Sequence, residues 1–239
     1  MPRFLLLQIR DADDPIRSQE VDCFARALEC SCADIDTCDL ILERPAQQQI
    51  DDARLVMIGG SGDYSVVEGG TWLPGALESM RQLCAAGKPT FASCWGFQAI
   101  SKALGGRVVT DLSRAELGSV TLRLTDAGLA DPLFAPLGAT FYGQMGHQDI
   151  VDALPADAVL LASSDKVPHQ AFRLSGQPIY ATQFHPELDR PSLIHRVQRY
   201  PQYVSRIVGT SCEEFIASCR DTPETSQLLR RFVKQVLGT

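Results

Sequence analysis

Short apolar runs alternate with segments of helical periodicity through the first hundred residues. The runs that favour strands are residues 4–9, 54–58 and 88–93, and the segments that favour helices are 21–28, 77–86 and 96–104. Gly105 and Gly106 fit the C-terminal cap of the last helix. Strands that alternate with helices in this way predict a mostly parallel sheet.

The middle of the chain has a different pattern, in which strand-like runs follow one another across short connections. These runs cover residues 116–124, 139–145, 158–164, 170–174 and 178–184. Short turn-rich connections favour antiparallel pairing for part of this region. We predict one α/β domain over residues 1–239: a single open, mostly parallel twisted sheet flanked by helices, with a small antiparallel section. A helical C-terminal tail is expected from about residue 190 to 239, interrupted near Gly209 and Pro223.

Composition and charge narrow the possible partners. Hydrophobic residues make up 45% of the chain and charged residues 21%, which is typical of a globular protein. The formal net charge is -7, whereas nucleic acids are normally bound by a basic protein surface. The charge therefore argues against a nucleic acid partner. No apolar run approaches the roughly 18 residues that span a bilayer, so we expect a cytoplasmic protein that binds no membrane.

The chain contains eight cysteines but no CxxC pair. In a chain of this size without a secretory signal, most of them are expected to be small buried apolar residues rather than disulfide partners or zinc ligands. We therefore expect neither a metal nor another cofactor.

One of these cysteines has an unusual neighbourhood. Cys94 stands in "FASCWGFQ", directly between a predicted strand and a predicted helix, with the small residues Ala92 and Gly96 two positions to either side. This spacing is typical of a nucleophile elbow. A thiol at a helix N-terminus is also favoured as thiolate by the helix dipole. Taken alone, the stretch fits a buried cysteine at a strand end better than a nucleophile.

A second motif supplies the groups that a nucleophile needs. "QFHPE" closes the last predicted strand with His185 and Glu187, which extended backbone places on the same side. A nucleophile requires a base, and the base requires a third group that holds its orientation. Alone, this tripeptide would more often be structural, but a Cys, His, Glu order is chemically complete.

The two motifs together resemble those of the class I glutamine amidotransferases. "CWGFQ", "QFHPE" and a glycine loop at residues 59–62 match the family pattern over roughly the first 190 residues. In particular, the chain resembles the glutaminase domain of GMP synthetase, standing alone. The combination of motifs is specific to the family, whereas either motif alone is not.

The resemblance implies the following roles. Cys94 attacks the side-chain amide of glutamine, His185 moves the proton to ammonia, and Glu187 orients the imidazole. The backbone N–H groups of Gly60 and Trp95 would form the oxyanion hole.

The resemblance also implies a set of substrate-binding residues. These are Gln98, Gly62, Gly146, Gln148 and Asp149. Gln98 follows the nucleophile by four residues, so its amide lies on the same helix face, although a solvent-facing glutamine is the alternative. His147 can equally be structural, and His169 and His195, which stand in no motif, are expected to be structural.

Two departures from the family leave details of the function open. Ser61 and Gly62 occupy a position where many relatives have proline, and no "SGGxDS"-like pyrophosphatase motif occurs. A glutaminase of this kind would need a separate ammonia-accepting synthase as its partner. The alternatives are a γ-glutamyl peptidase acting on small γ-glutamyl compounds, with the same triad, and a catalytically idle binding module, against which the intact triad argues.

Overall fold

The computed structural model describes residues 4–238, and the predicted domain limits at residues 1 and 239 lie outside that range. The strands are β1 Phe4–Ile9, β2 Ile35–Asp39, β3 Leu55–Ser61, β4 Thr90–Ser93, β5 Arg107–Thr110, β6 Glu116–Leu124, β7 Thr140–His147, β8 Asp149–Ala153, β9 Ala158–Ser163, β10 Ala171–Leu174 and β11 Ile179–Thr182. The α-helices are α1 Ile16–Leu28, α2 Gln47–Asp52, α3 Leu73–Ala85, α4 Trp95–Ala103, α5 Asp126–Ala130, α6 Arg190–Arg199, α7 Cys212–Ser218 and α8 Leu228–Leu237.

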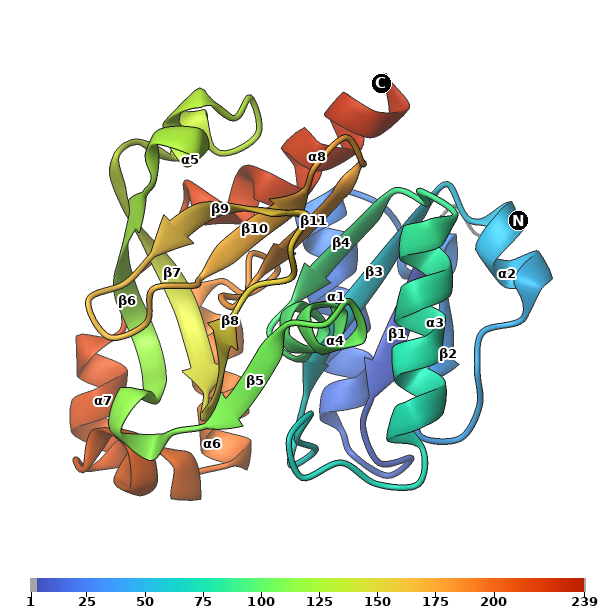
Figure 1. Cartoon of the computed structure of the whole chain (residues 1–239). Coiled ribbons are helices and arrows are strands. Elements are labelled where there is room, and N and C mark those ends of the chain that lie inside the picture. The colour runs from blue at the N-terminus through green and yellow to red at the C-terminus, as the bar shows by residue number, and fades with distance from the viewer. Residues whose placement is uncertain (1–3, 239) are drawn as a thin grey trace.

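One large sheet forms the centre of the molecule (Figure 1). In the described part of the chain its strand order is β2-β1-β3-β4-β11-β10-β9-β6-β7. The first five strands in this order pair in parallel, and each later pairing, starting with β11 and β10, is antiparallel. The open α/β sheet with an antiparallel section is therefore confirmed. The antiparallel section is not confined to a hairpin but reaches the β7 edge.

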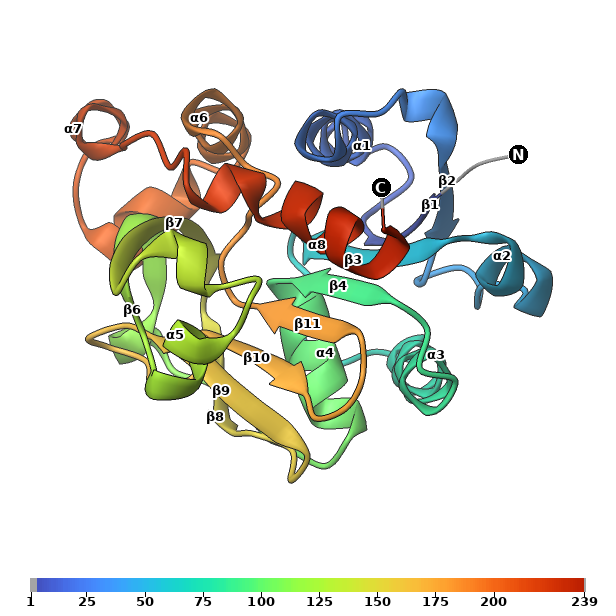
Figure 2. The same cartoon turned by 90° about the horizontal axis from the view of Figure 1, so that it is seen from above.

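Helices cover both faces of the parallel strands. Helices α1 and α8 lie on one face, and α3 and α4 lie on the other (Figure 2). Because side chains alternate along a strand, β1 sends Phe4 and Leu6 into the first layer and Leu5 and Leu7 into the second. This alternation gives the sheet an apolar core on each side.

Sequence reasoning missed three strands and shortened a fourth. The missed strands are β2 at the parallel edge and the pair β5 and β8, which form a small separate antiparallel sheet against α4. The predicted glycine loop at 59–62 was also partly wrong, because β3 continues through Gly59 and Gly60 to Ser61. Glycine has a low preference for strands, so a strand that contains it is hard to recognise from sequence. It occurs in strands where other groups approach the backbone closely.

The helical C-terminal segment consists of three α-helices, a π-helical turn, Val204–Val208, and a 3₁₀ turn, Thr225–Gln227. The break near Gly209 is present, and this residue has a left-handed φ of 74°. The segment does not extend away from the sheet. Phe232 of α8 packs on Phe91 and Tyr180. Side chains of α6 and α7 form a small third core together with Cys23 of α1. In residues 4–238 no helix has the length and apolar character that crossing a membrane requires.

Candidate active site

The two sequence motifs meet at the carboxyl ends of neighbouring strands. Cys94 follows β4 directly, and His185 follows β11 by three residues. Gly60 lies near the end of β3, and β4 runs between β3 and β11. In an open α/β sheet, this edge is where ligands bind.

Cys94 occupies a strained turn between β4 and α4. Its backbone angles are φ 51° and ψ -102°, and among residues 4–238 only Glu29 is another non-glycine residue with positive φ. Such a conformation costs about 1–3 kcal/mol and persists only where the surrounding structure imposes it. The Cys94 N–H donates to Thr182 O at 2.8 Å, and its thiol lies 3.7 Å from Gly146 O. The turn thus holds the sulfur at the surface of a cavity, with the residue 7% exposed.

Gly96 allows α4 to approach β3 closely enough to form this turn. A Cβ at position 96 would lie 2.8 Å from Cβ of Ile58 and 3.0 Å from its carbonyl oxygen. The Gly96→Ala variant should therefore lose about 1–3 kcal/mol of unfolding free energy, because backbone atoms of β3 would have to move. Urea denaturation measures the loss.

Gly75→Ala is the matched control, since Gly75 is also helical but its added Cβ would meet Arg44 at an ordinary 3.7 Å. This variant should be neutral or stabilised by less than about 1 kcal/mol. Equal stability of the two variants would contradict the close packing of α4 on β3.

His185 is buried between Cys94 and Glu187. Its Nδ1 lies 2.6 Å from Glu187 Oε1, and the charge and hydrogen bonding of the Cys94 thiol also act on its ring. A Cβ on Gly60 would lie 2.8 Å from Cε1 of the ring, so only glycine fits at that position. Burial alone would lower the pKa of His185, but the charges and hydrogen bonds of Glu187 and Cys94 raise it to about 9.

Glu187 belongs to a buried array of charges behind the histidine. Arg196 Nη1 of α6 lies 3.9 Å from Glu187 Oε1, and Arg196 Nη2 lies 3.8 Å from Glu20 Oε1. Arg10 in turn pairs with Glu20 at 3.3 Å. Burial acts to raise the pKa of Glu187, but the positive charges of His185 and Arg196 and the hydrogen bond from His185 lower it. The Glu187 carboxylate is thereby kept ionised.

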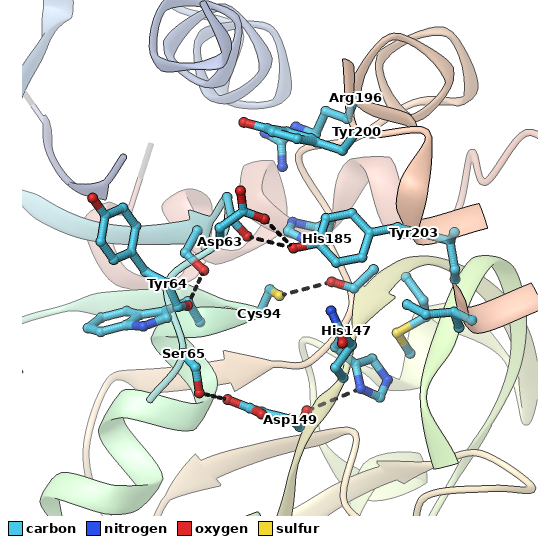
Figure 3. A pocket seen from close by; sticks show the side chains of 18 of the residues that line it. Asp63, Tyr64, Ser65, Cys94, His147, Asp149, His185, Arg196, Tyr200 and Tyr203 are labelled. Carbon is cyan, nitrogen blue, oxygen red and sulfur yellow. Dashed lines mark hydrogen bonds between the residues drawn. The ribbon is translucent and has the colours of Figure 1, made fainter. Parts of the chain in front are cut away.

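The other side of the cavity is polar and tightly hydrogen-bonded. Gln98 donates its side-chain N–H groups to Asp149 O at 2.9 Å and to Gln183 Oε1 at 3.1 Å. The Asp149 carboxylate accepts from Ser65 at 2.5 Å and from Thr110 at 2.6 Å. These bonds fix the strand connection 146–149 next to the sulfur (Figure 3).

His147 has a buried polar environment of its own. Nε2 lies 3.0 Å from Glu116 Oε2, and Nδ1 lies 3.2 Å from Asp149 O. Glu116 also accepts from Ser164 at 2.7 Å and from Gln170 at 2.5 Å. Both ring nitrogens are therefore committed to the protein, although the residue also lines the cavity.

A cavity of about 290 Å³ collects most of the predicted residues. The predicted residues that line it are Gly62, Cys94, Trp95, Gln98, Gly146, Gln148, Asp149 and His185. Gly60 and Glu187 are not in its lining but lie against His185. His169 bonds Val151 O at 2.8 Å and His195 is exposed, and neither lines the cavity.

Sequence reasoning missed a second group of lining residues. These are Leu193, Arg196, Val197, Tyr200, Tyr203, Arg206 and Ile207, from α6 and the turn that follows it. They lie beyond the last motif, in a segment whose helical periodicity suggests only packing. The one available signal in the sequence was the pair Tyr200 and Tyr203, which are three residues apart. This spacing could have indicated that the segment contributes side chains to the cavity.

Comparison with known proteins identifies the pattern. Residues 17–192 match the family model described as Glutamine amidotransferase class-I. The chain is 32% identical over 155 residues to a GMP synthase [glutamine-hydrolyzing] of Parafrankia sp. (strain EAN1pec), and 33% identical over 162 residues to the one of Aeromonas salmonicida (strain A449). These alignments cover 65% of this chain but only 26% and 29% of the two relatives. The chain therefore spans little more than a quarter of these curated relatives.

Solved structures share the fold at low sequence identity. A glutamine amidotransferase from Thermotoga maritima aligns with a TM-score of 0.79 at 18% identity, covering 100% of this chain and 99% of the other. A glutamine amido transferase from Methylobacillus flagellatus aligns with a TM-score of 0.71 at 19% identity, covering 99% of this chain and 92% of the other. At these identities the likeness extends to the fold alone.

Proposed function

Because this chain belongs to the class I glutamine amidotransferase family, we propose that it hydrolyses the side-chain amide of glutamine through a γ-glutamyl thioester on Cys94. The observation that carries this proposal is the arrangement of a strained Cys94, a buried His185 and an ionised Glu187 at one sheet edge.

The first step is acylation of the sulfur. The Cys94 thiolate attacks the γ-carbonyl carbon, and the C–N bond breaks as His185 gives its proton to the leaving ammonia. Glu187 holds the ring by the hydrogen bond at Nδ1 and stabilises the imidazolium. Water then attacks the thioester, His185 takes the proton, and glutamate leaves.

The oxyanion of each tetrahedral intermediate needs hydrogen-bond donors. Trp95 is the first residue of α4, so its N–H is among the helix donors that have no partner within the helix. The position of a Cβ on Gly60 would be only 3.7 Å from Cβ of Cys94. These positions support the proposal that the backbone N–H groups of Trp95 and Gly60 form the oxyanion hole. Loss of one such donor typically lowers the rate about 10²–10³-fold.

The polar side of the cavity suits the amino acid end of glutamine. Gly62, Gly146 and Gln148 line this cavity and would contact the substrate directly. Gln98 and Asp149 also line it, and their side chains are bonded to neighbouring protein groups. We propose that Gln98 and Asp149 hold residues 146–149 in position and also contact the substrate. The acceptor of the ammonia, by this proposal, is a separate synthase.

Covalent labelling tests the proposal without any partner. The purified protein is incubated with an electrophilic glutamine analogue, and the modified peptide is identified by mass spectrometry. Modification should be confined to Cys94 among eight cysteines and should slow when glutamine competes, while glutamine alone should release ammonia. Modification spread over several cysteines, without protection by glutamine, would instead support an idle binding module.

A further inference from the structure

Two buried charged side chains stand behind the proposed triad and outside both sequence motifs. Glu20 of α1 is shielded from water, and Arg196 of α6 is 9% exposed. Figure 3 shows Arg196 and Cys94 on opposite sides of His185. Arg196 also lies beyond residue 192, where the match to the family model ends. No motif therefore assigns these two residues a part in the chemistry.

The Arg196 guanidinium is held in place by helix α1. Its Nε donates to Gln19 Oε1 at 3.0 Å, and the Gln19 side-chain N–H donates in turn to Ser192 O at 3.1 Å. Glu20, the next residue of α1, places Oε1 3.8 Å from Arg196 Nη2. These contacts fix the guanidinium between α1 and α6.

Arg196 acts on Glu187 through its charge rather than through a hydrogen bond. The 3.9 Å between Arg196 Nη1 and Glu187 Oε1 exceeds the length of a hydrogen bond. Within residues 4–238, Arg196 Nη2 and Glu187 Oε2 are buried and have no hydrogen-bond partner. Oε1 therefore keeps its 2.6 Å bond to His185 Nδ1, while a positive charge lies nearby. Charges shielded from water interact strongly at such distances.

Glu20 counters the positive charge of Arg196. Its carboxylate also pairs with Arg10 at 3.3 Å. A Cβ on Gly59 would lie 2.6 Å from Glu20 Oε1, so this carboxylate lies directly against the end of β3, next to Gly60. The array thus contacts the strand end of the proposed oxyanion hole as well as the triad.

Three further titratable side chains face the pair of His185 and Glu187. Arg26 of α1 donates to the Glu187 carbonyl at 3.4 Å, and its guanidinium pairs with Asp189 at 3.3 Å. Cys23, also of α1, is buried, which raises the pKa of its thiol, so this group adds no charge near neutral pH. Cys94 acts on the His185 ring from the other side.

The sign of each charge determines how firmly His185 holds its proton. The negative charge of Glu187 favours the protonated ring. The positive charge of Arg196 opposes a second positive charge on the far side of the same carboxylate. Glu20 partly neutralises Arg196 and so weakens this opposition. Removal of Arg196 and removal of Glu20 should therefore act on His185 in opposite directions.

We propose that Arg196 and Glu20 are positioning residues that act through Glu187 on the proton of His185, Arg196 easing its release and Glu20 retaining it. The consequence for catalysis rests on the proposed function, because there His185 gives its proton to ammonia and later takes one from water. The balance between the two residues then sets the pH range of the reaction.

An NMR titration of His185 tests the proposal directly. The protein is labelled with ¹³C in its four histidines, and a His185→Gln sample identifies the signal of His185. The wild-type midpoint is expected near pH 9. In Arg196→Gln the midpoint should rise by about 0.5 pH unit or more, and in Glu20→Gln it should fall by a similar amount. Arg196→Lys, which keeps the charge, should restore the wild-type midpoint.

Arg199→Gln is the matched control for Arg196→Gln. Arg199 lies on the same helix but is exposed and outside the cavity lining. Its replacement changes the net charge of the protein by the same amount and leaves the buried array intact. Because exposed charges are screened by solvent and salt, the His185 midpoint should stay at its wild-type value.

The rate of glutamine hydrolysis should show the same opposite effects. The ratio of kcat/KM at pH 9.5 to kcat/KM at pH 7.5 should rise about 2-fold in Arg196→Gln and fall about 2-fold in Glu20→Gln. A merely structural role would lower the rate of both variants without moving this ratio in opposite directions.

The direction of each shift decides the outcome. Midpoints that move in the same direction, or that stay at the wild-type value, would overturn the proposal and leave Arg196 and Glu20 as a structural ion pair. Circular dichroism verifies folding. If only one variant folds, its own direction decides, since each variant has a required sign.

Failure of this proposal can be told apart from failure of the proposed function, because the titration needs no turnover. Opposite midpoint shifts in a protein that neither hydrolyses glutamine nor is labelled at Cys94 would refute the proposed function alone. Hydrolysis of glutamine with unshifted midpoints would refute the roles of Arg196 and Glu20 alone.

Discussion

Cys94→Ala should abolish ammonia release from glutamine, with a loss of about 10⁴-fold or more in kcat. In the proposed mechanism the sulfur forms the covalent intermediate, so no other group in the cavity should replace it. Initial rates are followed by coupled detection of ammonia, and circular dichroism verifies that the variant is folded.

Cys84→Ala is the matched control for this variant. Cys84 is another buried cysteine, on α3 and outside the cavity, and burial raises the pKa of its thiol to about 11. The variant should keep wild-type turnover. If Cys94→Ala retained more than a hundredth of the wild-type rate while Cys84→Ala did not, the nucleophile would have been assigned to the wrong cysteine.

Glu187→Gln should lower kcat/KM by about 10²–10⁴-fold and also change its pH dependence. In the wild type, His185 keeps its proton until the pH rises through about 9, so kcat/KM should fall above that value. Glu187 is a main cause of the raised pKa, and its neutral replacement should move this fall toward the ordinary histidine value of 6.5. The loss should therefore be larger at pH 8.5 than at pH 6.5.

The measurement is a pH–rate profile for both proteins, with Glu213→Gln as the control. Glu213 is exposed on α7, so this variant should follow the wild-type curve. A Glu187→Gln profile that keeps the wild-type shape at a lower height would mean that Glu187 does not set the charge of His185.

The strands and turns that position Cys94 and His185 could be predicted from sequence. Both follow apolar runs that are buried on two faces and therefore easy to recognise, and the helix after Cys94 ends at a double glycine. Strand β2, "IDTCD", is short and largely polar, and it pairs at the edge of the sheet along one side only. Its pattern therefore contains little evidence of a strand.

The part of the cavity lining that comes from α6 and the following turn could not be predicted from the sequence. Tyr200 meets Asp14 across 186 residues and Tyr203 meets Asp63 across 140, so no local motif connects them. Only the folded chain brings α6 and the following turn to Cys94. In the sequence, residues that line a cavity through such long-range contacts cannot be distinguished from ordinary helix residues.

The charged array behind His185 joins residues from the two ends of the chain, and this contact should constrain how both ends change in evolution. Arg10 and Glu20 come from the first twenty residues and Arg196 from the last fifty, and these three side chains are shielded from water with Glu187. Loss of one member would strand an opposite charge in the interior, at a cost of about 3–5 kcal/mol. Arg10, Glu20 and Arg196 should therefore change together in homologues, and a chimera that exchanges only one end of the chain should be stable only where it keeps all three charges.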